Sequence, residues 1–211
     1  MKELQSTDQS SEILREVDNF FMNTSSVHLT LRNVAQRLLK QQIDYVVIGG
    51  MALALHGLVR PTQDVDLLLT ASGLEDFGNK LVGLGYAPAF PGARKHFRDT
   101  ETGVRIDITT TGEFPGDSIA KAVSFPTPSA VAVLIDGFKV ISIEKLIELK
   151  LASALCAAHR SLRDLADVQQ LVETLDLPNN FSESLHVSVQ QEYQRLWQLA
   201  QLGKANENLE Q

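Results

Sequence analysis

Two aspartates one residue apart, in a stretch that ends in three leucines, constrain this chain more than any other feature. Asp64 and Asp66 belong to the run Thr62–Leu69, which follows the glycine pair Gly49–Gly50 and the apolar residues 45–48. The apolar end predicts a partly buried β-strand, and strand side chains alternate between two faces, so both carboxylates project from the same face. Unpaired charge beside a buried strand is costly. The same spacing also occurs where a strand ends in solvent.

A divalent cation would remove the repulsion between the two carboxylates. Mg²⁺ is the hard cation that proteins commonly hold with one or two carboxylates plus substrate phosphates. Asp107, in the apolar run 104–108, is the predicted third ligand, because its strand can lie beside the strand 64–69 and point at the same ion. There it can also accept the proton of an attacking hydroxyl. The alternative is a surface aspartate on an edge strand.

The glycine pair predicts a phosphate-binding turn. Gly49 and Gly50 carry no side chains, so their amides can approach a triphosphate, and the helix expected just after them presents free N–H groups. A tight turn alone is the simpler explanation. The spacing is neither the dinucleotide fingerprint nor the P-loop, because neither the three-glycine spacing nor a following Gly-Lys-Ser or Gly-Lys-Thr is present.

Together these residues resemble a known superfamily. They are Gly49, Gly50, Met51, Ala52, His56, Gly57, Arg60, Thr62, Asp64, Asp66 and, downstream, Asp107. The order is similar to nucleotidyltransferases with the polymerase-β-like fold, and looks most like the AbiEii/AbiGii-toxin-like branch, strongly over residues 44–110 and less over 142–172. The resemblance implies that the glycines hold the triphosphate, the paired aspartates bind Mg²⁺ and the third carboxylate activates the acceptor.

The resemblance also implies a nucleotide pocket in the later part of the chain. Lys150 and Asp164 match a helical lysine and a following aspartate that line the pocket in that branch. Arg60 can reach a phosphate or orient the carboxylates, and Thr62 is placed with the nucleotide-binding residues. The alternative for the later part is a solvated helix face, with Arg160 and Asp164 paired four residues apart.

The expected fold class is α+β: a nucleotidyltransferase fold with a mixed β-sheet flanked by helices. Its expected parts are an N-terminal helical segment (1–41), a nucleotidyltransferase core (42–141) and a C-terminal helical region (142–202). The predicted helices cover residues 11–22, 27–41, 51–57, 74–84, 142–159, 162–175 and 182–201. The predicted strands cover residues 45–48, 64–69, 95–98, 104–108, 130–135 and 138–141, with an irregular loop at 110–129.

The expected function is a Mg²⁺-dependent transfer of a nucleoside monophosphate from a nucleoside triphosphate to an acceptor hydroxyl. The acceptor is a tRNA, a protein or a small molecule, and the resemblance suggests a role in abortive infection or beside the partner protein of a toxin-antitoxin pair. The formal charge of −7 argues against a general nucleic-acid binder. The alternative is a non-catalytic nucleotide-binding or antitoxin-like module of the same fold.

The remaining polar residues are given structural roles. A single cysteine, Cys156, forms no intrachain disulfide and predicts a buried thiol in a reducing cytoplasm. Neither a secretion signal nor a membrane span is predicted. His56 is expected to pack on the short helix or bond a backbone carbonyl, His96 and His159 lack a partner at ligand spacing, and Trp197 is expected to pack between helices.

Overall fold

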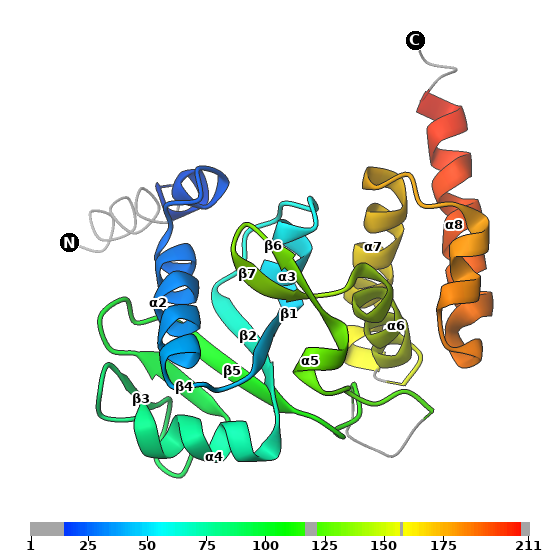
Figure 1. Ribbon diagram of the computed structural model, residues 1–211. Helices are drawn as coiled ribbons and strands as arrows, with labels where there is room; N and C mark the ends of the chain where they lie inside the picture. Colours follow the sequence, from blue (N-terminus) through cyan, green and yellow to red (C-terminus); the bar gives the residue numbers. More distant parts are fainter. Residues whose placement is uncertain (1–14, 117–121, 157, 208–211) are drawn as a thin grey trace.

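A seven-stranded mixed sheet forms the centre of the fold, in the strand order β3-β4-β5-β2-β1-β7-β6. The computed structural model describes residues 15–116, 122–156 and 158–207 (Figure 1). The strands are β1 (Tyr45–Ile48), β2 (Asp64–Leu69), β3 (Tyr86–Pro88), β4 (His96–Asp99), β5 (Arg105–Thr110), β6 (Ala132–Ile135) and β7 (Phe138–Ile141).

The middle of the sheet is apolar and carries the site strands. Every residue of β1 is buried, and in β2 the four residues other than the two aspartates are buried. Strand β1 runs antiparallel to β2 and parallel to β7, whereas β2 runs parallel to β5. The β-branched and aromatic side chains of β1 suit a strand that is covered on both faces. The expected α+β class with a mixed sheet is confirmed.

Helices cover the sheet and extend beyond it. They are α2 (Ser26–Lys40), α3 (Gly49–Leu55), α4 (Ala71–Lys80), α5 (Pro128–Val131), α6 (Ile143–Ala154), α7 (Ala158–Thr174) and α8 (Val187–Glu207), with a 3₁₀ turn at Asn179–Ser184. Helices α2 and α4 contact β2, and α6, α7 and α8 pack on one another at the right of the view (Figure 1). Within the described residues, no helix is long and apolar enough to cross a bilayer.

Several predicted boundaries move for local reasons. Helix α4 begins at Ala71 rather than residue 74, because the Thr70 hydroxyl accepts a hydrogen bond from the Gly73 amide at 2.9 Å and caps the first turn. It ends at Lys80, four residues before the predicted end. Strand β3 and helix α5 were not predicted, since each is only three or four residues long and contains a proline.

The hairpin of β6 and β7 is confirmed. Asp136 and Gly137 have φ angles of +49° and +83°, as a two-residue turn with both central residues left-handed requires. The predicted helix 11–22 is seen at residues 15–21, and its first residues lie outside the described part of the chain. The division into three parts stays a prediction.

The predicted burial of Cys156 is wrong, because its side chain is exposed. Helix α6 was expected to run to about residue 159 but ends at Ala154, so the cysteine follows the buried part of the helix.

Candidate active site

Three carboxylates converge on adjacent parallel strands. In the register of β2 and β5, Asp66 lies opposite Asp107, and Asp64 is two residues away on the same face as Asp66. One oxygen from each of the three side chains lies within 4.8 Å of the others, and all three residues are partly buried. The predicted placement of Asp107 beside the pair is therefore correct. An all-oxygen donor set of this kind suits a hard divalent cation.

The glycine pair makes room for the side chains of this site. A Cβ built on Gly49 would lie 2.0 Å from Asp66 Oδ2, and one on Gly50 would lie 2.6 Å from Thr62 Oγ1. Gly49 also has a φ of +65°, which L-residues avoid. The Thr62 hydroxyl in turn donates a hydrogen bond to Asp64 Oδ1 at 2.9 Å. Helix α3 begins at Gly49 itself rather than after the pair.

An arginine and a histidine already contact the carboxylates. Arg105 Nη2 lies 3.1 Å from Asp64 Oδ2 and 3.0 Å from Asp107 Oδ2, and its side chain is 51% exposed. His96 Nδ1 lies 2.9 Å from Asp107 Oδ1. His96 has no partner at ligand spacing in the sequence, but β4 and β5 pair antiparallel and place it opposite Asp107. Arg105 was missed, although its position two residues before Asp107 on a strand puts it on the same face.

A second charged cluster joins α6 and α7. Lys150 Nζ lies 3.1 Å from Asp164 Oδ1 and 2.7 Å from Asp167 Oδ2, with side-chain exposures of 12%, 5% and 5% for the three residues. The alternative of a solvated helix face is therefore wrong. Arg60 also reaches this cluster, where its Nη2 donates a hydrogen bond to Asp167 Oδ2 and its Nε forms an ion pair with Asp167 Oδ1, both at 3.0 Å.

Arg60 therefore binds an aspartate of α7 rather than the three clustered carboxylates. Asp167 was missed as a member of the cluster. The available signal was its spacing of three residues from Asp164, which places both on one side of a helix. The side chains of His159 and Arg160 lie outside the described residues.

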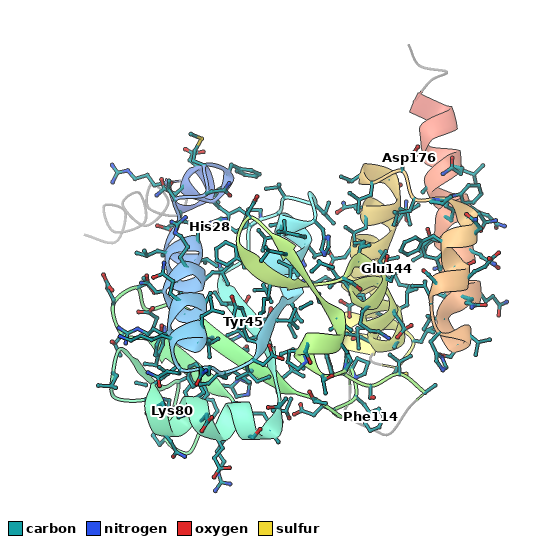
Figure 2. All side chains as sticks on the ribbon, viewed as in Figure 1. His28, Tyr45, Lys80, Phe114, Glu144 and Asp176 are labelled. Carbon is teal, nitrogen blue, oxygen red and sulfur yellow. The ribbon has the colours of Figure 1, made fainter. Side chains whose placement is uncertain are left out.

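One pocket connects the two charged clusters. Its volume is about 230 Å³, and its lining includes Gly49 and Asp66 at one end and Lys150 and Asp164 from the helices. Gly50, Arg60, Thr62, Asp64 and Asp107 are not among the lining residues that the structure describes. The loop after β5 closes another side through Phe114, which is labelled in Figure 2. The rest of the lining is Ile48, Thr109, Glu113, Pro115, Gly116, Phe125, Ile141, Leu146, Leu149 and Ser153.

Glu113 carries a fixed negative charge at the edge of this pocket. Burial raises the pKa of its carboxyl, but hydrogen bonds from Lys95 and Thr110, together with the charge of Lys95, outweigh burial and leave the pKa below the ordinary value. The partners are an ion pair with Lys95 Nζ and hydrogen bonds from the Thr110 hydroxyl and amide. The loop after β5 is thus tied to the sheet by a charged group.

Two structural roles predicted from sequence are confirmed. His56 Nε2 lies 2.7 Å from the carbonyl oxygen of Ile141, so the histidine links α3 to the end of β7. Trp197 donates from Nε1 to the carbonyl of Leu177 at 3.0 Å and packs against the core.

Comparison with known proteins finds similarity to solved structures, but none to family models or curated sequences. A candidate nucleotidyltransferase from Thermotoga maritima is 16% identical over 70% of this chain and 91% of its own, with a TM-score of 0.42. An antigenic nucleotidyltransferase-like protein from Paracoccidioides brasiliensis is 18% identical over 86% of this chain and 89% of its own, with a TM-score of 0.48.

The antibiotic-resistance factor ANT(2'')-Ia is 12% identical over 86% of this chain and 97% of its own, with a TM-score of 0.41. Another structure of that protein holds adenylyl-2''-tobramycin. Likeness at this level carries no statement about the substrate of the present chain.

Proposed function

We propose that the protein is a Mg²⁺-dependent nucleotidyltransferase that moves a nucleoside monophosphate from a nucleoside triphosphate to an acceptor hydroxyl. The observation that carries the proposal is the meeting of Asp64, Asp66 and Asp107 on two parallel strands, beside a pocket that Asp66 also lines. Catalysis of this transfer requires a site that can stabilise charge developing on the phosphate oxygens.

The residues present fit a Mg²⁺ site. The donors are carboxylate oxygens from three side chains close enough to share an ion, and Gly49 provides the space that the Asp66 carboxylate occupies. Asp64, Asp66 and Asp107 would hold the metal. Bound there, Mg²⁺ would neutralise charge on the transferred phosphate and on the leaving pyrophosphate.

The chain's own groups account for the remaining requirements. Asp107 would accept the proton of the acceptor hydroxyl, and His96, at 2.9 Å from its Oδ1, fixes the orientation of the carboxyl group. Gly49 and Gly50 would leave their amides open to the triphosphate. Thr62 orients Asp64 through its hydroxyl.

The nucleoside would occupy the pocket between Asp66 and the α6–α7 cluster. Lys150 and Asp164 line it directly, whereas Arg60 supports it through Asp167. Apolar walls and a few convergent polar groups are typical of small-molecule sites. The acceptor is a tRNA, a protein or a small molecule; the last of these is the class bound by ANT(2'')-Ia. The proposal also includes membership of the toxin-like branch, a partner protein in a toxin-antitoxin pair and a cytoplasmic location.

One observation favours a second candidate, a nucleotide-binding module without turnover. Arg105 contacts both Asp64 and Asp107, so part of the carboxylate charge is neutralised by the chain itself. In such a module the guanidinium would stay in place and no metal would be needed.

The proposal is tested by incubating the protein with labelled nucleoside triphosphates, Mg²⁺ and a total cell extract of RNA, protein and small molecules. We expect label to move to one acceptor fraction, and Asp66→Asn and Asp107→Asn to abolish the transfer. Asp76→Asn is the matched control, because Asp76 lies on the exposed side of α4 in an ion pair with Lys80. Binding of nucleotide without transfer would establish the module instead. Full transfer by Asp66→Asn would refute the assignment of the site.

A further inference from the structure

We propose that Asp164 selects the base of the nucleotide, with Ser153 as a second contact, and that this pair binds bases with an exocyclic amino group beside a ring-nitrogen acceptor. On the Watson–Crick edge these are adenine, with its 6-amino group beside N1, and cytosine, with its 4-amino group beside N3. The inference rests on the proposed function, because it takes the pocket beside Asp66 as the nucleoside site.

The first observation is a pair of unsatisfied oxygens at one pocket. Asp164 Oδ2 and Ser153 Oγ are buried and have no hydrogen-bond partner among the residues that the structure describes. Both residues line the pocket, and they are only 4% and 6% exposed. Buried polar atoms in folded proteins nearly always have partners, and an orphaned one is destabilising. Two such atoms at one pocket indicate that a ligand supplies the missing partners.

The second observation is the way the surrounding charges hold Asp164. Its other oxygen, Oδ1, lies 3.1 Å from Lys150 Nζ, and the same ammonium group contacts Asp167 at 2.7 Å. Lys150 therefore keeps the Asp164 carboxylate paired and oriented, and Oδ2 is the oxygen left for a ligand. A carboxylate in an ion pair only accepts hydrogen bonds.

The third observation is the shape of the α6 wall. Leu146, Leu149, Lys150 and Ser153 are spaced three and four residues apart on this helix, so they share one face, and all of them line the pocket. The apolar residues of this face suit the flat surface of a heterocyclic base. The polar groups at its end would meet the edge of that base, with small adjustments of side chains at the wall.

The hydrogen-bonding properties of the two oxygens determine which edge of a base can pair with them. An exocyclic amine donates a hydrogen bond to Asp164 Oδ2, and the Ser153 hydroxyl donates to the adjacent ring nitrogen. A base with a carbonyl at the same place turns an acceptor toward the carboxylate, which cannot donate to it. The serine hydroxyl can accept from the ring N–H of such a base, so the discrimination comes from Asp164. Sites built around buried polar groups discriminate strongly against a ligand that leaves those groups unpaired.

Two pairs of nucleotides isolate this edge. ATP carries an amino group at purine position 6, whereas ITP carries a carbonyl there and a hydrogen on the adjacent N1. CTP and UTP differ in the same way at pyrimidine position 4 and the adjacent N3. We expect calorimetric titration with Mg²⁺ and no acceptor to show binding of ATP over ITP, and of CTP over UTP, by about tenfold or more. Equal affinities within both pairs would overturn the inference and leave the transferase proposal standing.

Variants separate recognition of the base from binding of the triphosphate. Ser153→Ala should weaken the binding of ATP and CTP by several-fold, because the ring nitrogen loses its hydrogen-bond donor. Asp164→Asn should abolish both preferences, since an amide can accept from an amine or donate to a carbonyl; its circular dichroism spectrum must match that of the wild type. If Asp164→Asn does not fold, Ser153→Ala still decides, because unchanged affinities for ATP and CTP in that variant would overturn the role of the serine. If none of the four nucleotides binds, the proposed function fails, and this inference with it.

Discussion

Replacing Gly49 by alanine tests whether the glycine pair serves the carboxylate site. The new Cβ would lie 2.0 Å from Asp66 Oδ2 and 2.6 Å from its Cγ, so the carboxylate has to move. The φ of +65° adds the strain of a left-handed L-residue. That strain costs about 1–2 kcal/mol, and forced overpacking costs about 1–3 kcal/mol. The expected loss of unfolding free energy is therefore about 2–5 kcal/mol.

Gly92→Ala is a matched control for backbone strain. Gly92 has a φ of +83°, and a Cβ built there meets nothing within 4 Å. We expect this variant to lose only the strain, about 1–2 kcal/mol. Urea unfolding followed by circular dichroism measures both variants under the same conditions. A Gly49 variant that is no less stable than the Gly92 variant would refute the close approach of Asp66.

A double-mutant cycle locates the clash. Asp66→Ala removes the carboxyl group that the new methyl group would meet first, so Gly49→Ala should cost less in that background than in the wild type. The cost should fall toward that of the Gly92 control. Gly49→Ala should also weaken Mn²⁺ binding, measured by electron paramagnetic resonance, whereas Gly92→Ala should not.

Three further changes test the charged groups. Arg105→Met should tighten Mn²⁺ binding severalfold, because the guanidinium contacts two of the proposed ligands; weaker binding would mean that it holds them in place for the ion. Lys150→Met should reduce the unfolding free energy by about 3–5 kcal/mol, since it leaves the buried Asp164 unpaired and Asp167 with Arg60 alone. A loss of about 1 kcal/mol or less in urea unfolding, the range of an exposed pair, would contradict the buried cluster. Glu113→Gln should cost about 1 kcal/mol at pH 7, as expected for a partly exposed pair. The pKa of Glu113 is lowered from 4.5 on folding, so its ionised form stabilises the fold above that pH. The difference from the wild type should disappear as the pH falls through the lowered pKa, and a constant difference down to that pH would refute this account.

The sequence was sufficient to predict the strand elements that carry the carboxylates. Alternation along a strand placed Asp64 and Asp66 on one face, and the apolar run around Asp107 marked its strand. These are local properties, because the residue pattern of such a strand is sufficient to predict that one face is charged and the other buried. The adjacency of β2 and β5 was an inference about the fold, and the register confirms it.

The partners of the site residues depended on contacts that no local pattern contains. His96 meets Asp107 because two strands pair antiparallel, and Arg60 meets Asp167 across more than a hundred residues of sequence. The reason for the glycine pair also lies in a long-range contact that the local sequence does not show. Its missing side chains give room to Asp66 and Thr62, which lie on or just before a neighbouring strand.

Lys150 and Arg105 differ in how easily each could exchange its partners. Lys150 is 12% exposed and contacts two buried carboxylates, so moving it toward a phosphate would leave Asp164 without compensation and Asp167 with Arg60 alone. Arg105 is 51% exposed, and its partners are the carboxylates that a metal ion would neutralise in its place. An exposed arginine loses little on leaving such a pair. The residue free to exchange partners when substrate arrives is therefore Arg105, and Lys150 is better suited to holding Asp164 in place.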